Sequence, residues 1–147
     1  MIKWILAVAL LAITSAGAAL NKPEAAIHYR QNVFGTIVWN FGPMSAMVRG
    51  KIPYDKVLFE RHAIRVSQFA PMLLEGFPKG SEAGAETEAR SEIWANWADF
   101  QSKMKTFEVE SAALARLAKI GTLDAVKAQF GKVGASCKAC HDKYKAE

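Results

Sequence analysis

The chain of 147 residues contains only two cysteines, so a fold stapled by several disulfide bonds is excluded. Beyond the first twenty residues no apolar run is long enough to cross a bilayer, because a membrane-spanning helix needs about 20 apolar residues. No stretch alternates between apolar and polar residues as a strand would, and Asn-Gly and Asp-Gly hairpin turns are missing. These absences leave a helical chain in which all thiol chemistry belongs to Cys137 and Cys140.

The charges of the chain show no strong bias. It carries 19 Lys and Arg against 14 Asp and Glu, a formal net charge of +5 that is spread along the sequence. No basic run is interleaved with aromatic residues, so nucleic acid is not expected as a partner. The mild positive excess indicates a solvated surface, and it could favour an acidic periplasmic redox protein as a partner.

The N-terminal residues have the features of a secretory signal peptide. Lys3 supplies a positive charge, an apolar run follows it, and small residues at positions 15–19 offer a cleavage site. A membrane anchor is the alternative, but the apolar run is short for a span. We predict that residues 1–19 are removed on export and that residues 20–147 form one soluble domain without a membrane partner.

Four segments with helical spacing of apolar residues, separated by Gly and Pro, account for nearly all of this domain. Short links make neighbouring helices antiparallel, so we predict an all-α, antiparallel four-helix bundle. Asn21 and Thr122 are candidate caps of the first and last helices. Gly42-Pro43 should kink the first helix, and Pro71 could stop the second early. The expected helices run from about residue 23 to 48, 54 to 75, 91 to 120 and 122 to 144, with a loop at 76–90.

The strongest signal in the sequence is Cys137-Lys138-Ala139-Cys140-His141, close to its end. Cys-x-x-Cys-His is the attachment motif of a c-type haem. Two thiols one helical turn apart can each add to one vinyl group on the same porphyrin edge, and the adjacent imidazole can bind the iron. The motif continues the apolar stripe of the last helix, so we expect the iron-binding face, with His141 as metal ligand, to point into the bundle.

Three other uses of the cysteine pair are less favoured. A structural zinc site needs four ligands, and the remaining histidines, His28 and His62, lie on separate predicted helices. A redox-active dithiol belongs at a helix N-terminus, where the helix dipole lowers the thiol pKa, whereas this pair lies near a C-terminus. A disulfide between residues three apart in one helix would be strained. Covalent haem c remains the best interpretation.

Two polar residues interrupt the apolar stripe of the first helix. Arg30 and Gln31 could simply reach solvent at the edge of the bundle. If a haem lies inside, however, a guanidinium and an amide suit its propionates, and we favour this role. Phe34, one turn further, would pack in the core and fill the space on the side of the iron opposite His141. Four methionines could each serve as a sixth ligand, and none is favoured by position: Met44, Met47, Met72 and Met104.

Several shorter motifs occur along the chain: Lys22-Pro23-Glu24, Tyr29-Arg30-Gln31, Phe41-Gly42 with Met44, Pro53-Tyr54-Asp55, Thr87-Glu88-Ala89, Glu92-Ile93-Trp94, and Gly134-Ala135-Ser136 before the haem motif with Tyr144 after it. With the haem motif, they resemble the cytochrome c′ family, c-type cytochromes built as four-helix bundles. The resemblance covers the whole region after the signal peptide. It implies a periplasmic protein with one haem c, commonly a homodimer paired through its first two helices.

The resemblance also implies roles for single residues. The iron would be five-coordinate and high-spin, with His141 on one side and Phe34 as the bulky apolar residue on the other. Many members have Arg four residues after the haem His, at a proximal pocket where NO can displace that His, whereas this chain has Lys145. Many also have Trp after the second helix, where this chain has Met72-Leu73-Leu74. The remaining residues implied at the haem are Arg30 and Gln31 at the propionates and Thr87 or Glu88 in a loop contact.

An apolar distal wall indicates which ligands the iron would take. Without a hydrogen-bond donor over the metal, bound O₂ gains no polar stabilisation, whereas NO and CO depend on it less. We therefore expect a periplasmic NO- and CO-binding protein, not an enzyme, that buffers or detoxifies NO. An electron carrier between periplasmic partners is the alternative. An NO or peroxide reductase is less favoured, because the polar acid/base pair of peroxidases is not found.

Overall fold

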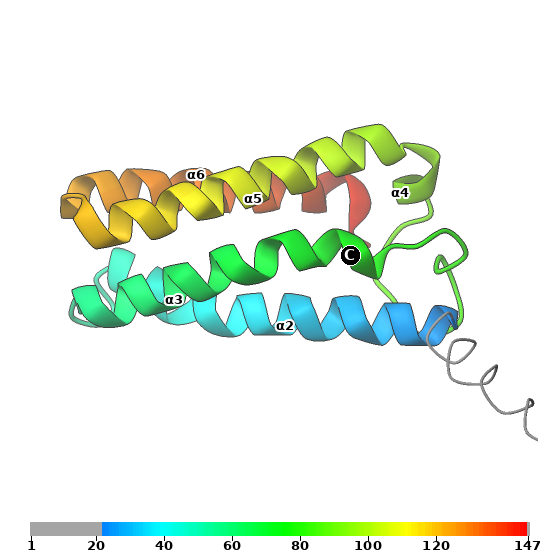
Figure 1. Ribbon diagram of the computed structural model, residues 1–147, viewed down its shortest axis with the longest axis horizontal. Coiled ribbons are helices and arrows are strands. Elements are labelled where there is room, and N and C mark those ends of the chain that lie inside the picture. The colour runs from blue at the N-terminus through cyan, green and yellow to red at the C-terminus, as the bar shows by residue number, and fades with distance from the viewer. Residues whose placement is uncertain (1–21, 147) are drawn as a thin grey trace, which may run out of the picture.

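The computed structural model describes residues 22–146, which form four long helices packed side by side (Figure 1). The all-α four-helix bundle predicted from the sequence is confirmed. Within the described residues there is no strand, and one isolated antiparallel bridge joins Ala89 to Lys145. The elements are α2 (Pro23–Val48), α3 (Lys56–Phe69), the 3-10 helix η1 (Ala70–Gly76), α4 (Glu92–Ala95), α5 (Trp97–Ile120) and α6 (Leu123–Tyr144).

The two ends of the bundle are built differently (Figure 1). The short connections, residues 49–55 and 121–122, both lie at one end, which we call the turn end. The long connection, residues 77–91, lies at the other end together with the end of α6, and we call this the loop end. No helix among the described residues is long and apolar enough to span a membrane. The long connection leaves space for a site at the loop end, whereas the short connections leave none at the turn end.

Polar caps start two of the long helices. Asp55 caps α3 by accepting a backbone hydrogen bond of 2.9 Å on its carboxylate. Thr122 Oγ1 accepts a 3.3 Å bond from a backbone N–H at the start of α6, so the cap predicted from the sequence is confirmed. The cap position of α2 is Lys22, which makes no side-chain cap bond. The predicted cap, Asn21, lies outside the described residues.

The third predicted helix was wrong as one unbroken helix, whereas the second ends early, as the sequence indicated that Pro71 could cause. The third predicted helix is broken at Asn96 (φ −120°, ψ 42°) into α4 and α5. The Asn96 side chain donates to the Glu92 carbonyl at 3.0 Å, alongside the regular helical bond of 2.9 Å from the Asn96 backbone N–H, and so competes for an acceptor of the helix. The second helix stops being α-helical at Phe69, shortly before Pro71, and continues as η1. Pro43, in contrast, lies inside α2 without ending it.

Apolar residues from all four long helices fill the interior. Phe41 of α2 stacks on Phe130 of α6 with ring centroids 4.4 Å apart. Phe59 of α3 meets the same Phe130 ring edge-on at 6.2 Å, so three helices contact one another through aromatic rings. The largest fully buried apolar side chains are Phe59, Phe100, Ile27, Met44, Leu73, Ile93, Leu114, Val66, Val126 and Val133.

One polar pair is buried between α2 and α3. His62 Nδ1 lies 3.0 Å from Asn40 Oδ1, and the Asn40 amide donates to the Thr36 carbonyl at 2.7 Å. Because the Asn40 nitrogen is engaged there, its oxygen faces the ring, and we assign the donated proton to His62 Nδ1. Burial lowers the pKa of His62, and the charges of Arg65 and Arg61 lower it further. The folded protein therefore keeps His62 neutral.

We predict that His62 makes the fold less stable in mild acid. In the unfolded chain a histidine takes up a proton near its ordinary pKa of 6.5, whereas the folded state resists it, so the free energy of unfolding falls as the pH drops below that value. His62→Gln cannot become charged and should lack this part of the pH dependence. Urea unfolding from about pH 7.5 to about pH 5, followed by circular dichroism, measures both proteins. A stability difference between them that stays constant over this range would contradict the prediction.

Candidate functional site

The last turns of α6 carry the side chains of the haem motif. Cys137 and Cys140 are half-buried against the core and form no disulfide. Burial raises the pKa of both thiols, to about 11 for Cys140, so both are protonated at neutral pH. His141 follows about 100° further around the helix and is exposed. The imidazole lies at the edge of the core, where it lines the cavity described next.

The imidazole of His141 is held in its neutral form. Partial burial lowers the pKa of His141, and the charge of Lys145 lowers it further, while Asp142 and Glu88 act in the opposite direction. A neutral imidazole keeps a nitrogen lone pair that a metal can accept. The side chain can therefore act as a metal ligand without first losing a proton.

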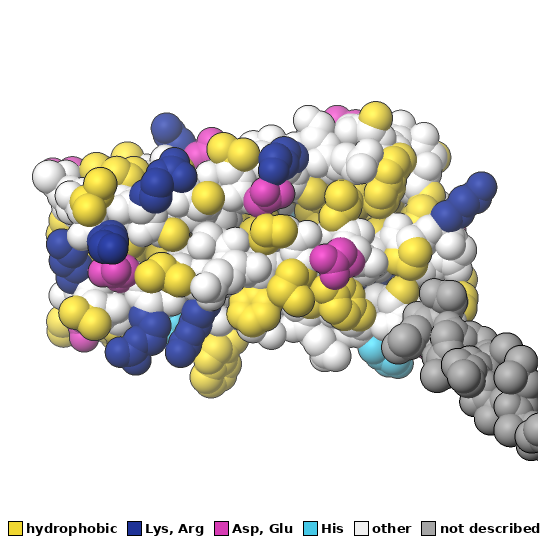
Figure 2. Space-filling model, viewed as in Figure 1, with side chains coloured by type: hydrophobic (Ala, Val, Ile, Leu, Met, Phe, Trp, Pro, Cys, Tyr) yellow, Lys and Arg dark blue, Asp and Glu magenta, His cyan; other side chains and the backbone are white. Residues whose placement is uncertain are grey.

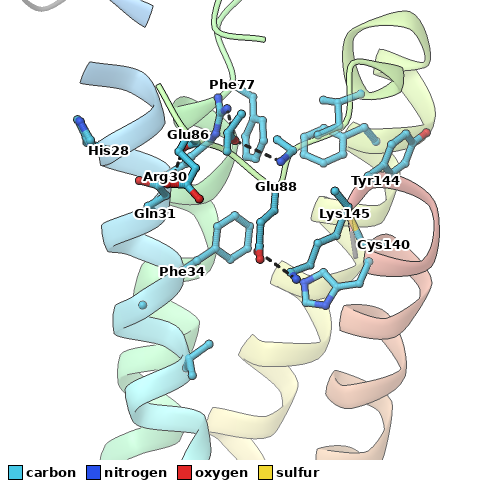
Figure 3. Close-up of a pocket in the computed structure, with 18 residues that line it drawn as sticks. His28, Arg30, Gln31, Phe34, Phe77, Glu86, Glu88, Cys140, Tyr144 and Lys145 are labelled. Carbon is cyan, nitrogen blue, oxygen red and sulfur yellow. Dashed lines mark hydrogen bonds and ion pairs between the residues drawn. The ribbon is translucent and has the colours of Figure 1, made fainter. Parts of the chain in front are cut away.

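A cavity of about 860 Å³ lies beside this turn, between α2, the end of α6 and the connection 77–91 (Figure 3). Its volume falls within the range of about 300–1,000 Å³ typical of small-molecule and cofactor sites. Cys140 and His141 line it, whereas Cys137 is not among the lining residues. The predicted site residues from other elements that also line it are Arg30, Gln31, Phe34, Thr87 and Glu88.

Helix α2 contributes an apolar wall to the cavity. The Phe34 ring points into the cavity, toward the side on which Cys140 lies (Figure 3), and meets Phe77 edge-on with centroids 6.4 Å apart. Val38 continues the wall toward solvent. The polar lining from α2 ends at Gln31. Beyond Gln31, α2 therefore offers the cavity no side chain that could donate a hydrogen bond.

None of the four methionines considered as a sixth ligand is among the residues that line this cavity. Met44, Met47 and Met104 are buried in the core, and Met72 of η1 packs against it. Their role in the described part of the chain is packing, which is the usual role of methionine at helical spacing.

Arg30 makes more hydrogen bonds than any other side chain at the cavity, and it is only 2% exposed. Its Nη1 donates to the Gly76 carbonyl at 3.1 Å and to both the carbonyl and the hydroxyl oxygen of Ser81 at 3.0 Å. Its Nη2 donates to Thr87 Oγ1 at 2.9 Å, and none of these bonds uses Nε. The guanidinium also lies 4.9 Å from the centre of the Phe77 ring. Sequence reasoning missed this role of Arg30 as the anchor of the long connection.

The neighbours of Arg30 in α2 hold adjacent parts of the chain. The Tyr29 hydroxyl donates to Glu75 Oε2 at 2.9 Å, at the end of η1. Gln31 Nε2 donates to the Glu86 carbonyl at 2.9 Å, within the connection 77–91. Arg30 and Gln31 thus fix the connection that closes the cavity (Figure 3), and Tyr29 fixes the end of η1 that precedes it.

Thr87 and Glu88 line the cavity where the connection meets the end of the chain. The Glu88 carboxylate forms an ion pair with Lys145 Nζ at 3.0 Å (Figure 3). The Glu88 carbonyl accepts a 2.7 Å bond from the N–H of Ala146, next to the bridge between Ala89 and Lys145. The residues after α6 therefore close the cavity on that side.

Aromatic residues that the sequence did not assign to the site line the inner part of the cavity. Phe100 meets Phe77 at a centroid distance of 4.8 Å and Tyr144 at 5.3 Å, both edge-on. The Tyr144 hydroxyl donates to Asp99 Oδ2 at 2.5 Å. The helical spacing of Phe100 and Tyr144 signalled burial, but only the fold brings them to one cavity.

The donor set and the cavity fit a c-type haem. Two thiols one turn apart, followed by an imidazole, match the covalent and metal-binding needs of this group. The apolar lining suits a flat hydrocarbon ring, and the guanidinium and amide of Arg30 and Gln31 suit its carboxylates.

Comparison with known proteins gives a consistent result. The family model described as Cytochrome C′ matches residues 25–145. The chain is 40% identical over 131 residues to cytochrome c′ of Halomonas halodenitrificans, covering 86% of this chain and 99% of that protein. It is 38% identical to cytochrome c′ of Alcaligenes xylosoxydans xylosoxydans, covering 84% and 95%.

Solved structures agree with these matches. Cytochrome c prime from Shewanella frigidimarina is similar with a TM-score of 0.84 and 45% identity, over 86% of this chain and 98% of that one. A nitric oxide complex of a leucine-to-isoleucine variant of cytochrome c prime from Alcaligenes xylosoxidans has a TM-score of 0.79 and 37% identity, over 86% and 98%. From its cysteine motif to its bundle and its cavity, this chain belongs to the cytochrome c′ family.

Proposed function

We propose that this protein carries one haem c, binds NO and CO, and buffers or removes NO. The observation that carries the proposal is the apolar wall of the cavity. The Phe34 ring faces inward there, and the residues of α2 that line the cavity after Gln31 are all apolar or glycine. Such a wall gives bound O₂ no hydrogen bond, whereas NO and CO depend less on one. The nitric oxide complexes of the Alcaligenes xylosoxidans relative support the proposal.

The residues of α6 and α2 would act on opposite sides of the group. When bound, the haem iron supplies the open position at which a diatomic gas coordinates. Cys137 and Cys140 would hold the group covalently, and His141, with its neutral imidazole, would be the ligand from the protein. The Phe34 ring would fill the other side, keep water out, and have to move aside to admit a ligand.

Arg30 and Gln31 keep donors for the haem propionates while they hold the connection. The hydrogen bonds of Arg30 use Nη1 and Nη2 and leave Nε. The Gln31 amide has two N–H donors, and one bond to Glu86 uses one of them. Thr87 and Glu88, on the connection, would contact the group from a third side.

We predict that Phe34→Ala speeds CO binding to the ferrous protein by about tenfold or more, because a barrier lower by about 1.4 kcal/mol suffices for that change. Flash photolysis or stopped flow measures the association rate. Phe41→Ala is the matched control, since Phe41 also lies on α2 and is partly buried but stacks on Phe130 instead of lining the cavity. If both variants bind CO at the same rate, Phe34 does not guard the metal.

The coordination state distinguishes gas binding from the alternative, electron transfer between periplasmic proteins. Because no methionine lines the cavity, we expect a five-coordinate, high-spin ferrous spectrum that changes on addition of NO. Absorption spectroscopy of protein matured in a host that attaches haem c measures this, and an intact mass that includes one haem is the control. A low-spin, six-coordinate ferrous spectrum would favour electron transfer instead.

We also propose that residues 1–19 are removed on export to the periplasm, that residues 20–147 are the working domain, and that two copies pair through α2 and α3. Large apolar side chains are exposed on these helices: Trp39 is 77% and Val38 69% exposed, and Ile64 of α3 is also exposed. A second copy that offers the same face would cover them, as an isologous interface requires.

Trp39→Glu should turn this dimer into a monomer, because a carboxylate at the centre of an apolar interface would be buried without a partner. Light scattering coupled to size exclusion gives the mass in solution. Val109→Glu, which places the same charge on an exposed valine of α5, should leave the dimer intact. Equal masses for the two variants would contradict pairing through α2.

A further inference from the structure

Basic side chains gather at the turn end of the bundle, although they come from distant parts of the sequence. The stretches 49–57 and 116–127 meet there (Figure 1) and together contain only two acidic residues, Asp55 and Asp124. In Figure 2, the Lys and Arg side chains of the visible face lie mostly in this half of the bundle. No ion pair within residues 22–146 involves the six basic residues of this end. They are Arg49, Lys51, Lys56, Arg116, Lys119 and Lys127.

The same two stretches expose large apolar side chains. Ile120 is 78% exposed and Val57 67%, and Ile52 and Leu123 are also exposed. Single exposed apolar residues are common on protein surfaces. Here, however, four of the eight large apolar side chains exposed in the described residues lie at one end of the bundle, among six basic groups. Such a gathering marks an interaction surface.

The long connection at the loop end carries the opposite charge. Residues 75–92 contain five glutamates against two basic residues, Lys79 and Arg90. The basic, partly apolar turn end thus contrasts with an acidic segment over the cavity, although Lys143 and Lys145 at the end of α6 also lie at the loop end. The glutamates are Glu75, Glu82, Glu86, Glu88 and Glu92.

We propose that the turn end docks onto the surface of an anionic lipid membrane. Clusters of about four to eight Lys and Arg side chains attract anionic headgroups, and apolar side chains among them insert at the boundary between headgroups and acyl chains. The sequence led us to expect no membrane partner, because no later segment can cross a bilayer. Docking on the surface needs no such segment, and it turns the cavity away from the membrane.

The chemistry of this end favours lipid over the other candidate partners. An acidic protein would match the charges but would not require apolar tips on both turns. A ligand pocket is not involved, because no residue of either stretch lines the cavity. The proposal is thus independent of haem and gas binding, and its failure would leave the proposed function untouched.

Cosedimentation with lipid vesicles tests the proposal on the haem-loaded protein, with its N-terminus determined by mass spectrometry. We expect binding to vesicles with about one-third phosphatidylglycerol, loss of binding as salt rises, and little binding to pure phosphatidylcholine vesicles. An apolar N-terminal segment left in place would instead bind both kinds of vesicle. Equal binding to both, or no binding to anionic vesicles at low salt, would overturn the proposal.

Charge variants locate the surface. Each basic side chain removed should lower the partition coefficient about fivefold, so Lys51→Gln combined with Lys119→Gln should lower it about 25-fold. The control removes the same charge at the loop end, through Lys22→Gln combined with Lys79→Gln. If the control weakens binding as much, net charge is responsible and the turn end is not the docking surface.

Variants that replace exposed apolar residues distinguish binding to lipid from binding to an acidic protein. Ile120→Ser should lower partitioning about tenfold through the loss of an inserted side chain. Val109→Ser on the middle of α5 should have no effect. Fluorescence from Trp39, Trp94 and Trp97, which lie outside both stretches, should not shift on binding, and a shift would indicate another face. Capture of the protein by an acidic protein column, with no vesicle binding, would overturn the assignment to lipid.

Discussion

The site depends on one buried charge, the guanidinium of Arg30. A charged group that is 2% exposed is tolerated only when its donors are paired, because an unpaired buried charge is strongly destabilising. Its acceptors, on Gly76, Ser81 and Thr87, lie 46, 51 and 57 residues away along the chain. The connection must therefore fold back over α2 before Arg30 can be buried. The same contact explains the glycine at position 76, where a Cβ atom would lie 2.5 Å from Arg30 Cβ.

The cavity follows from the unequal ends of the bundle. At the turn end, short connections join neighbouring helices. At the loop end, the long connection 77–91 is bound to α2 by Arg30 and Gln31, and this leaves space between α2 and the end of α6. The cavity of about 860 Å³ is partly open to solvent, so the apolar side chains that line it lack packing partners on that side. A group that fits between Phe34 and the end of α6 would supply the missing contacts and stabilise the folded state that binds it. Cofactor binding and the order of the loop end are therefore linked.

Local rules predicted much of this structure, and the failures have physical causes. Apolar spacing predicted the four long helices, and the cysteine motif and the interruption at Arg30 predicted residues that line one cavity. The break at Asn96 was missed because a side chain that competes for a backbone carbonyl leaves no trace in apolar spacing. The partners of Arg30 could not be predicted, since they depend on how a long loop folds back.

Net charge was the least informative property of the sequence, and the geometry of the bundle explains why. Charges in water are screened over about 8 Å at physiological ionic strength. With 24 residues, α5 is about 36 Å long at 1.5 Å per residue, so the two ends are several screening lengths apart. The glutamates of the loop end thus cannot cancel the basic groups of the turn end. A chain with a formal net charge of +5 therefore presents a basic turn end and an acidic connection, and each acts on its own surroundings.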